Sequence, residues 1–212
     1  DKKPCINIYG GEMSDNIRCF QVLGSTELNI HGGLFQNNVL NSGGGAVINT
    51  TVSGVSVHIS GGTFRNNALT GTAKTAVGTI FCTSNSTGLV ITGGTFSGNT
   101  CAYDPAQNGF SCTASSAGKA LSPVIQPGAN GLDLSDAPFV WTFAENAACL
   151  QIAGALTSAV KVQYLAAPVT GQVVAVGAEG YTLTQADLAK LSCLNEGVSL
   201  RLDTTKNQII VA

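Results

Sequence analysis

The chain has 212 residues, 10% of them charged, and a formal net charge of −2, and this length allows one elongated domain or two small ones. It has no cluster of lysine and arginine residues to neutralise phosphates, so the composition does not suit a nucleic-acid-binding protein or a patch that binds anionic membranes. The sequence also lacks an apolar run of about 18 residues, so we expect no segment that spans a bilayer.

The N-terminal half repeats one pattern four times: aliphatic-x-Ile-x-Gly-Gly-x-Phe-x-x-Asn, with methionine in place of phenylalanine in the first copy. The copies occupy residues 6–16, 28–38, 57–67 and 89–99. Their Gly-Gly pairs begin at Gly10, Gly32, Gly61 and Gly93, at steps of 22, 29 and 32 residues. Self-similarity at such periods indicates a solenoid of stacked coils.

Each copy predicts a short strand, a sharp corner and a second strand. The two aliphatic residues before the glycines alternate with outward positions, which is the period of a strand with one buried face. The glycines can turn the chain sharply, and the aromatic residue then returns to the interior. Parallel stacking predicts a core column of Met13, Phe35, Phe64 and Phe96, and a structural hydrogen-bonding column of Asn16, Asn38, Asn67 and Asn99.

One further strand per coil fits between the copies. Aligned backwards from the next copy, residues 19–23, 48–52 and 80–84 come into register as this strand. The additional length of the second and third coils then falls in one corner, at residues 40–45 and 68–74, just after the asparagine column. Solenoids carry loops in this way without disturbing the stack.

These features resemble the right-handed, single-stranded parallel β-helix repeats of exported bacterial cell-surface proteins. The resemblance covers residues 6–99 and implies an all-β solenoid with three strands per turn. It implies no particular activity, because such proteins include polysaccharide lyases, hydrolases, adhesins and inert stalks. A leucine-rich repeat is the alternative fold, with similar periods and an asparagine, but it requires neither the double glycine nor the phenylalanine.

We assign residues 1–99 to parallel β-helix coils, 100–131 to an extruded loop or transition, and 132–212 to degenerate coils followed by a β-rich cap. A fainter copy of the repeat occupies residues 150–156; its glycine lies 61 residues beyond Gly93, which leaves room for two coils. Further strands are expected near 161–165 and 172–176. Thr184 and Asp187 resemble a capping box ahead of one short helix, and residues 199–212 predict a β-hairpin.

The seven cysteines form no metal-binding motif. Their count is odd, no C-x-x-C spacing occurs and only two histidines are present, so we expect no zinc site. Cys19 and Cys82 replace aliphatic residues and are interpreted as small buried hydrophobes. Cys101 and Cys112 flank a loop that a disulfide could close if an export route supplies the oxidant, and the reduced alternative stays open.

The coils carry no column of acidic residues. A solenoid active site is built from equivalent positions on successive coils. The equivalents of Glu12 in the later coils are Leu34, Thr63 and Thr95, and those of Asp15 are Asn37, Asn66 and Gly98. Arg18 and Arg65 do not occupy equivalent positions and are interpreted as solvated surface charges. We therefore identify no catalytic residue, no metal ligand and no cofactor site.

The outward positions of the first strand form two polar columns. One contains Asn7, Asn29, His58 and Val90, and the other contains Tyr9, His31, Ser60 and Thr92. Amides and hydroxyls both donate and accept hydrogen bonds, so such columns can dock sugar hydroxyls or a partner strand. We select Tyr9, Asn29, His31, His58 and Ser60 as candidate ligand-binding residues; the alternative is an ordinary solvated face.

The sequence thus predicts a non-enzymatic module of a secreted or cell-surface bacterial protein. It would serve as an adhesin-like stalk or bind a polysaccharide or a host or cell-surface protein. The alternative is a fragment of a β-helix polysaccharide lyase or glycoside hydrolase whose catalytic coils lie outside this chain. A third hypothesis, a structural spacer, predicts no binding. Because Asp1 to Pro4 lead directly into a complete repeat, we expect a processed leader, earlier coils or both upstream.

Overall fold

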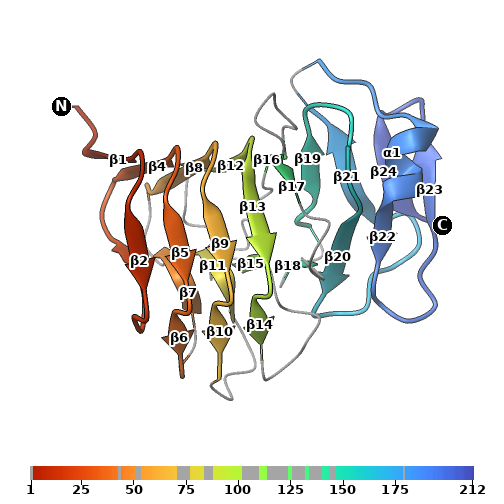
Figure 1. Ribbon diagram of the computed structural model, residues 1–212. Coiled ribbons are helices and arrows are strands. Elements are labelled where there is room, and N and C mark those ends of the chain that lie inside the picture. The colour runs from red at the N-terminus through yellow and green to blue at the C-terminus, as the bar shows by residue number, and fades with distance from the viewer. Residues whose placement is uncertain are drawn as a thin grey trace.

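The chain folds into a stack of parallel coils, as the computed structural model in Figure 1 shows. The structure describes residues 2–42, 44–50, 54–70, 77–83, 88–101, 110–113, 124–125, 132–133, 140–143, 147–178 and 180–212. Nearly all of their elements are short strands, and α1 (Gln185–Lys190) is the one helix among them. No helix in this part of the chain is long and apolar enough to cross a bilayer. The predicted all-β, parallel β-helix fold is confirmed.

Four sheets run along the stack. Sheet A has nine strands, in the order β1 (Cys5–Ile8), β4 (Glu27–Ile30), β8 (Ser56–Ile59), β12 (Gly88–Ile91), β16 (Val124–Ile125), β19 (Leu150–Ile152), β21 (Val173–Gly177), β24 (Gln208–Val211) and β23 (Leu200–Asp203). Sheet B has five, β2 (Glu12–Ser14), β5 (Leu34–Gln36), β9 (Thr63–Arg65), β13 (Gly94–Ser97) and β17 (Leu132–Asp133). Sheet C has seven, β3 (Phe20–Val22), β7 (Gly44–Thr50), β11 (Val77–Thr83), β15 (Phe110–Thr113), β18 (Val140–Phe143), β20 (Val160–Tyr164) and β22 (Leu191–Cys193). Sheet D has three short strands, β6 (Val39–Leu40), β10 (Ala68–Leu69) and β14 (Thr100–Cys101).

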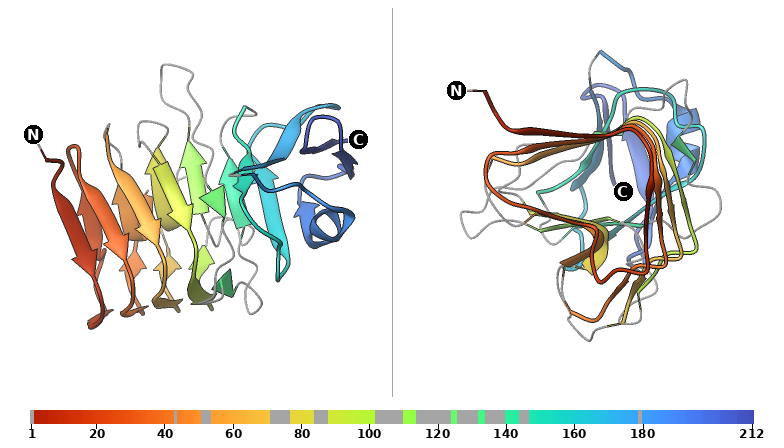
Figure 2. Two further views of the ribbon diagram at one scale, coloured as in Figure 1. Left: turned by 90° about the horizontal axis from the view of Figure 1, so that it is seen from above. Right: turned by 60° about the vertical axis from the view of Figure 1, so that its left-hand side comes forward.

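The repeats lie over one another in the predicted register, and the first coils overlie each other when seen nearly along the stack (Figure 2). In sheet A, Leu28 pairs with Ile6 on one side and with Val57 on the other, all in parallel. Val57 in turn pairs with Leu89. The aliphatic positions of the four copies therefore form one inward column.

The aromatic column is confirmed in sheet B, where Phe35 pairs with Met13 and Phe64, and Phe64 with Phe96. The rings of Phe35 and Phe64 stack with centroids 4.8 Å apart, and those of Phe64 and Phe96 are 4.6 Å apart. All three rings are buried. Burial of each should contribute roughly 1.5–3 kcal/mol, so this column is a main part of the core.

The two glycines of the second and third corners are needed for different reasons. A Cβ atom on Gly32 would lie 2.6 Å from the carbonyl oxygen of Tyr9 in the preceding coil, and one on Gly61 would lie 2.3 Å from that of His31. The second glycine instead has a positive φ, 110° at Gly33, which other residues rarely adopt. The first glycine therefore lets coils pack closely, and the second turns the chain.

The asparagine column is structural, as predicted. Asn67 Oδ1 accepts from the backbone N–H of Asn38 at 3.2 Å and from its Nδ2 at 2.8 Å. Asn67 Nδ2 donates to the carbonyl oxygen of Phe35 at 3.0 Å. The same three bonds join Asn99 to the coil before it. These asparagines are buried, so their amides satisfy backbone groups that the corner would otherwise leave unpaired.

The corner after the asparagine column holds the additional length, as predicted, but part of it forms sheet D. Leu40 and Leu69 of this sheet make a second small hydrophobic cluster with Ala46, apart from the main core. The two-residue strands of sheet D are too short to show a period, so the sequence predicts only a loop there.

Two predictions at β3, the first strand of sheet C, and just before it were wrong. The alignment placed Cys19 opposite Ile48, whereas Phe20 pairs with Ile48, a shift of one residue. Arg18 is a half-buried side chain rather than a solvated charge. Its Nε donates to the carbonyl oxygen of Gly45 at 3.0 Å, and burial lowers the pKa of its guanidinium.

Cys82 is fully buried, as interpreted, and burial raises the pKa of its thiol to about 12.

The sheets continue beyond the fourth repeat. In sheet A, Ile125 pairs with Ile91 and Ile152, so these isoleucines form one column and two further coils follow β12. The strands expected near 161–165 and 172–176 are β20 and β21. Residues 100–131 include β14, β15 and β16, each paired in parallel with the preceding coil. The side chains of Cys101 and Cys112, and hence their possible disulfide, lie outside the described part of the chain.

The predicted helix and hairpin form the C-terminal end. Thr184 caps α1: its backbone N–H donates to Asp187 Oδ2 at 2.9 Å, and its Oγ1 accepts from the backbone N–H of Asp187 at 3.3 Å. Asp187 Oδ1 also accepts from the backbone N–H of Leu156 at 2.9 Å, while Lys190 Nζ donates to the carbonyl oxygen of Leu156. Strands β23 and β24 pair antiparallel, and β24 lies antiparallel to β21. The helix is thus fixed to the backbone of a coil.

Candidate functional site

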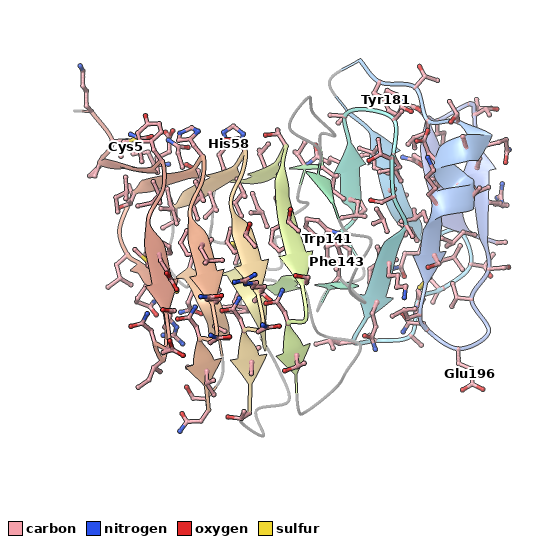
Figure 3. The ribbon with its side chains drawn as sticks, viewed as in Figure 1. Cys5, His58, Trp141, Phe143, Tyr181 and Glu196 are labelled. Atoms are coloured by element: carbon pink, nitrogen blue, oxygen red, sulfur yellow. The ribbon has the colours of Figure 1, made fainter. Side chains whose placement is uncertain are left out.

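The polar columns predicted from the sequence lie on the outer face of sheet A. Parallel pairing places Asn29 between Asn7 and His58, with its buried neighbours Leu28 and Ile30 facing the core. The ladder continues one residue past each strand: the backbone N–H of His31 donates to Ile8 and that of Ser60 to Ile30, both at 2.8 Å. Cys5 and His58 mark this side of the solenoid in Figure 3. Both columns are therefore held in register by the backbone.

Tyr9, His31 and Ser60 contact one another in sequence along the second column. The rings of Tyr9 and His31 stack with centroids 4.8 Å apart and planes 11° apart. His31 Nδ1 lies 3.0 Å from Ser60 Oγ, within hydrogen-bond distance. Tyr9 is 75% exposed, so its ring presents aromatic surface to solvent beside these polar groups.

Asn29 belongs to a second group on the same face. Its Nδ2 lies 3.1 Å from Asn7 Oδ1, 2.9 Å from Glu27 Oε1 and 3.3 Å from Cys5 Sγ. The Glu27 carboxylate can only accept, so it orients the amide with Nδ2 toward it. This orientation turns Asn29 Oδ1 away from Glu27, where it can accept a hydrogen bond from a ligand.

His58 lies in the column of Asn29 but forms a hydrogen bond with a residue of the Tyr9 column. Its Nε2 is 3.4 Å from Thr92 Oγ1 in the next coil. His31 and His58 therefore each share a hydrogen bond with a hydroxyl of the following coil. Both imidazoles are oriented by these contacts.

All five candidate residues thus lie on one face, but they form three contact groups. Tyr9, His31 and Ser60 touch directly, Asn29 bonds to its neighbours in the first two coils, and His58 bonds to Thr92. The selection missed Cys5, Glu27 and Thr92. The strand period was the signal for two of them, because Cys5 and Glu27 stand two residues before Asn7 and Asn29 and so face the same way.

The acidic residues of the first coil have structural roles, one in a hydrogen bond and one in a turn. On sheet B, Glu12 Oε1 accepts from Gln36 Nε2 at 2.6 Å, and Gln36 Oε1 accepts from Arg65 Nε at 2.8 Å. Asp15 has a φ of 58°, and the equivalent Asn37 and Asn66 both have 54°. Asparagine and aspartate tolerate this left-handed conformation better than most residues, which explains the position-15 column without catalysis.

The chemistry offered by the face is hydrogen bonding and aromatic stacking. Among the described ranges, no group of three or more histidine, cysteine, aspartate or glutamate side chains is placed to hold a metal ion. The charged groups near the columns are Glu27 and Lys3, whose Nζ donates to Ser56 Oγ at 3.2 Å. Comparisons of the chain with protein-family models, with curated proteins and with solved structures return no match.

Proposed function

We propose that the protein is a non-enzymatic binding module of an exported bacterial cell-surface protein, of the adhesin-like type. Its ligand would be a polysaccharide or a protein at a cell surface, bound on the outer face of sheet A. The observation that carries the proposal is the exposed Tyr9–His31 ring stack, flanked by amide and hydroxyl groups held in register across four coils.

The geometry supports binding of an extended ligand. Adjacent coils repeat at the strand spacing of about 4.8 Å, so the face offers similar groups at regular intervals. Asn7, Asn29, Ser60 and Thr92 supply groups that donate and accept, as sugar hydroxyls or a peptide backbone require. The exposed tyrosine adds an apolar surface with a polar edge, a combination frequent in binding sites.

The composition supports export. The outer face is rich in hydroxyl and amide side chains and weakly charged, as expected for the surface solenoids that the repeat resembles. Fractionation of the native cells, with antibody against this chain, should find it outside the cytoplasm. Recovery in the cytoplasmic fraction alone would contradict this part of the proposal.

The binding proposal is tested on glycan arrays and on immobilised cell-surface proteins. The double variant Tyr9→Ala with His31→Ala should weaken binding of any ligand found at least tenfold, because it removes the stack. Thr63→Ala, on the outer face of sheet B, is the matched control and should bind as the wild type does. Equal binding by the double variant, or turnover of a bound polysaccharide by the wild type, would overturn the proposal.

A further inference from the structure

The outer face of sheet A carries a carboxylate with one oxygen unused. Glu27 lies in the second coil, between Cys5 of the coil before and Ser56 of the coil after, and its side chain is half-buried. Its Oε1 accepts from Asn29 Nδ2 at 2.9 Å. Among the described residues, no group donates a hydrogen bond to Oε2 and no cation pairs with the carboxylate. Oε2 is therefore open to a donor from outside the protein.

The amide donors beside Glu27 are used within the group itself. Asn29 Nδ2 donates to Asn7 Oδ1 at 3.1 Å as well as to Glu27, and Asn7 Nδ2 donates to Cys5 Sγ at 3.5 Å. Within the described ranges, Asn29 Oδ1 accepts no hydrogen bond from the protein. The group of Cys5, Asn7, Glu27 and Asn29 thus presents acceptors outward, and a ligand that satisfies it has to donate.

A cationic donor fits these acceptors better than a neutral one. A hydrogen bond between an ammonium group and a carboxylate is charge-assisted and roughly twice as strong as one between neutral groups. An ammonium group also reaches this edge of the face within the protein, because Lys3 Nζ donates to Ser56 Oγ at 3.2 Å, beside Glu27. The net charge of −2 favours the approach of a cationic ligand as well.

The face suits a saccharide better than a peptide. The backbone of β4 pairs with β1 on one side and with β8 on the other, so a ligand on the outer face meets side chains only. A peptide binds a sheet chiefly through its backbone at an edge strand, whereas every unit of a saccharide presents polar groups to side chains. Glu27, Asn29 and His31 face outward along β4 and the residue after it, over roughly 13 Å. A few sugar units reach from the carboxylate to the ring stack.

We infer that the outer face of sheet A binds a polysaccharide that contains amino sugars. The ammonium group of one unit donates to Glu27 Oε2 and Asn29 Oδ1, and a neighbouring unit lies beside the rings of Tyr9 and His31. This inference rests on the proposed function, because it names the class of ligand for the same face. N-acetylation of the ligand removes its positive charge and most of its N–H donors, so Glu27 distinguishes amino sugars from their acetylated forms.

Two matched ligands test the inference: a chitosan hexamer, made of glucosamine, and the same hexamer fully N-acetylated. Calorimetric titrations at about pH 6, where aliphatic amines carry a proton, should show that the wild type binds the glucosamine hexamer at least tenfold more tightly. Glu27→Gln keeps the shape of the side chain and a carbonyl acceptor for Asn29, but it removes the charge. It should weaken binding of the glucosamine hexamer at least tenfold and change that of the acetylated hexamer by less than about threefold.

Glu12→Gln is the matched control, because it removes the same charge from sheet B, where Glu12 accepts from Gln36. It should leave the affinity for both hexamers within about twofold of the wild type. An equal loss in Glu12→Gln and Glu27→Gln would indicate general charge attraction and overturn the inference. A lysine hexapeptide that binds as tightly as the glucosamine hexamer would assign the face to a cationic protein and overturn it too.

Failure of this inference is distinguishable from failure of the proposed function. Equal affinity of the wild type for the two hexamers, or binding of neither, would overturn the amino-sugar assignment. The proposed binding face is decided separately, by the effect of Tyr9→Ala with His31→Ala on whichever ligand binds.

Discussion

Neighbouring asparagines in the repeat have different tasks. Asn67 is buried and bonds to both adjacent coils, so its side-chain amide acts as part of the backbone ladder. Asn66, one residue earlier, is exposed and has a φ of 54°, so it serves the turn. In the next coil Gly98 takes that position with a φ of 60°. The sequence predicted the buried column from its invariance among the four copies.

The turn position could also have been found in the sequence. Its four occupants are Asp15, Asn37, Asn66 and Gly98, which are the residue types that adopt a left-handed conformation most readily. An acidic column does not explain this position, because only Asp15 of the four residues carries a charge. A left-handed turn does explain it, because the four residue types share that backbone preference.

Phe64→Ala should destabilise the protein by about 3–5 kcal/mol, as a large-to-small change in a packed core. Phe64 is fully buried between the rings of Phe35 and Phe96, so the truncation removes two stacked contacts and leaves a cavity. Urea unfolding followed by circular dichroism measures the loss. Thr63→Ala, whose side chain faces outward on the same strand, should change stability by less than about 0.5 kcal/mol. Equal unfolding midpoints would contradict the inward assignment of the phenylalanine column.

At the scale of elements, prediction succeeded where the strand period was clear. Strands β4, β8 and β12 alternate buried and outward residues and end at a Gly-Gly corner, so their bounds and register followed from the sequence. Strand β3 did not, because Cys19 and Phe20 are adjacent and both pack partly against the core. Two neighbouring apolar residues do not decide which one faces inward, and a shift of one residue resulted.

The capping helix was predictable because its signal is chemical rather than periodic. The capping box of Thr184 and Asp187 is present as predicted. The sequence did not show that the same carboxylate reaches the backbone N–H of Leu156. Leu156 is far from the helix in the sequence, and only the stacking of coils brings the two together.

Asp187 should make the stability of this cap depend on pH. Burial acts to raise the pKa of the carboxyl group, but hydrogen bonds from Leu156, Thr184 and Tyr181 outweigh it and lower the pKa below its ordinary value. A carboxyl group with a lowered folded-state pKa stabilises the fold above its unfolded pKa of about 3.9. That stabilisation should be lost as the pH falls through the folded-state value.

Asp187→Asn tests this dependence. At pH 7 the variant should be less stable than the wild type by about 1–3 kcal/mol, because several buried hydrogen bonds lose their charged acceptor. The difference in urea midpoints should narrow as the pH falls from about 5 toward 2, where the wild-type carboxyl is protonated. Glu196→Gln, at an exposed position, is the control and should show no such difference. If the difference in urea midpoints between Asp187→Asn and the wild type stays constant with pH, Asp187 is not the source of the pH dependence.

At the scale of the whole molecule, the sequence predicted the solenoid from less than half of the chain. After Asn99 the Gly-Gly corners disappear, yet Ile125 and Ile152 continue the column that begins with Ile8 and Ile30 and passes through Ile59 and Ile91. Single inward residues of this kind are too sparse to reveal a period in the sequence. The later coils keep the stack because each needs only a strand edge and a few apolar residues to pair with the coil before it.

The candidate binding face depends on this arrangement of the whole stack. Tyr9, His31 and Ser60 lie one coil apart from one another in the sequence, at steps of 22 and 29 residues, and meet only because the coils repeat in parallel. Alignment of the repeats predicted both columns correctly. It did not predict which members touch, because ring stacking and the His58–Thr92 contact depend on side-chain rotamers.

Because each coil contacts mainly its neighbours, the stability of the stack should be local along its axis. In a solenoid, destabilising one repeat lowers the free energy of opening of that repeat and its neighbours more than that of distant ones. Under native conditions, Phe64→Ala should therefore speed amide exchange in β5, β9 and β13 by at least tenfold. Exchange in β21 and β24, several coils away, should stay within about threefold of the wild type.

Tyr164→Ala is the converse variant. Tyr164 is buried in a later coil, where its hydroxyl donates to the carbonyl oxygen of Ala148 at 2.9 Å and its ring packs against Phe143 with centroids 5.3 Å apart. Its loss should speed exchange in β18, β20 and β22 and spare β4 and β8. If either variant speeds exchange equally in all strands, the chain opens as one cooperative unit, and the coils are not energetically local. If Phe64→Ala and Tyr164→Ala each speed exchange in a separate set of strands, each coil is stabilised mainly by its neighbours, through the same strand pairing that aligns the outer face.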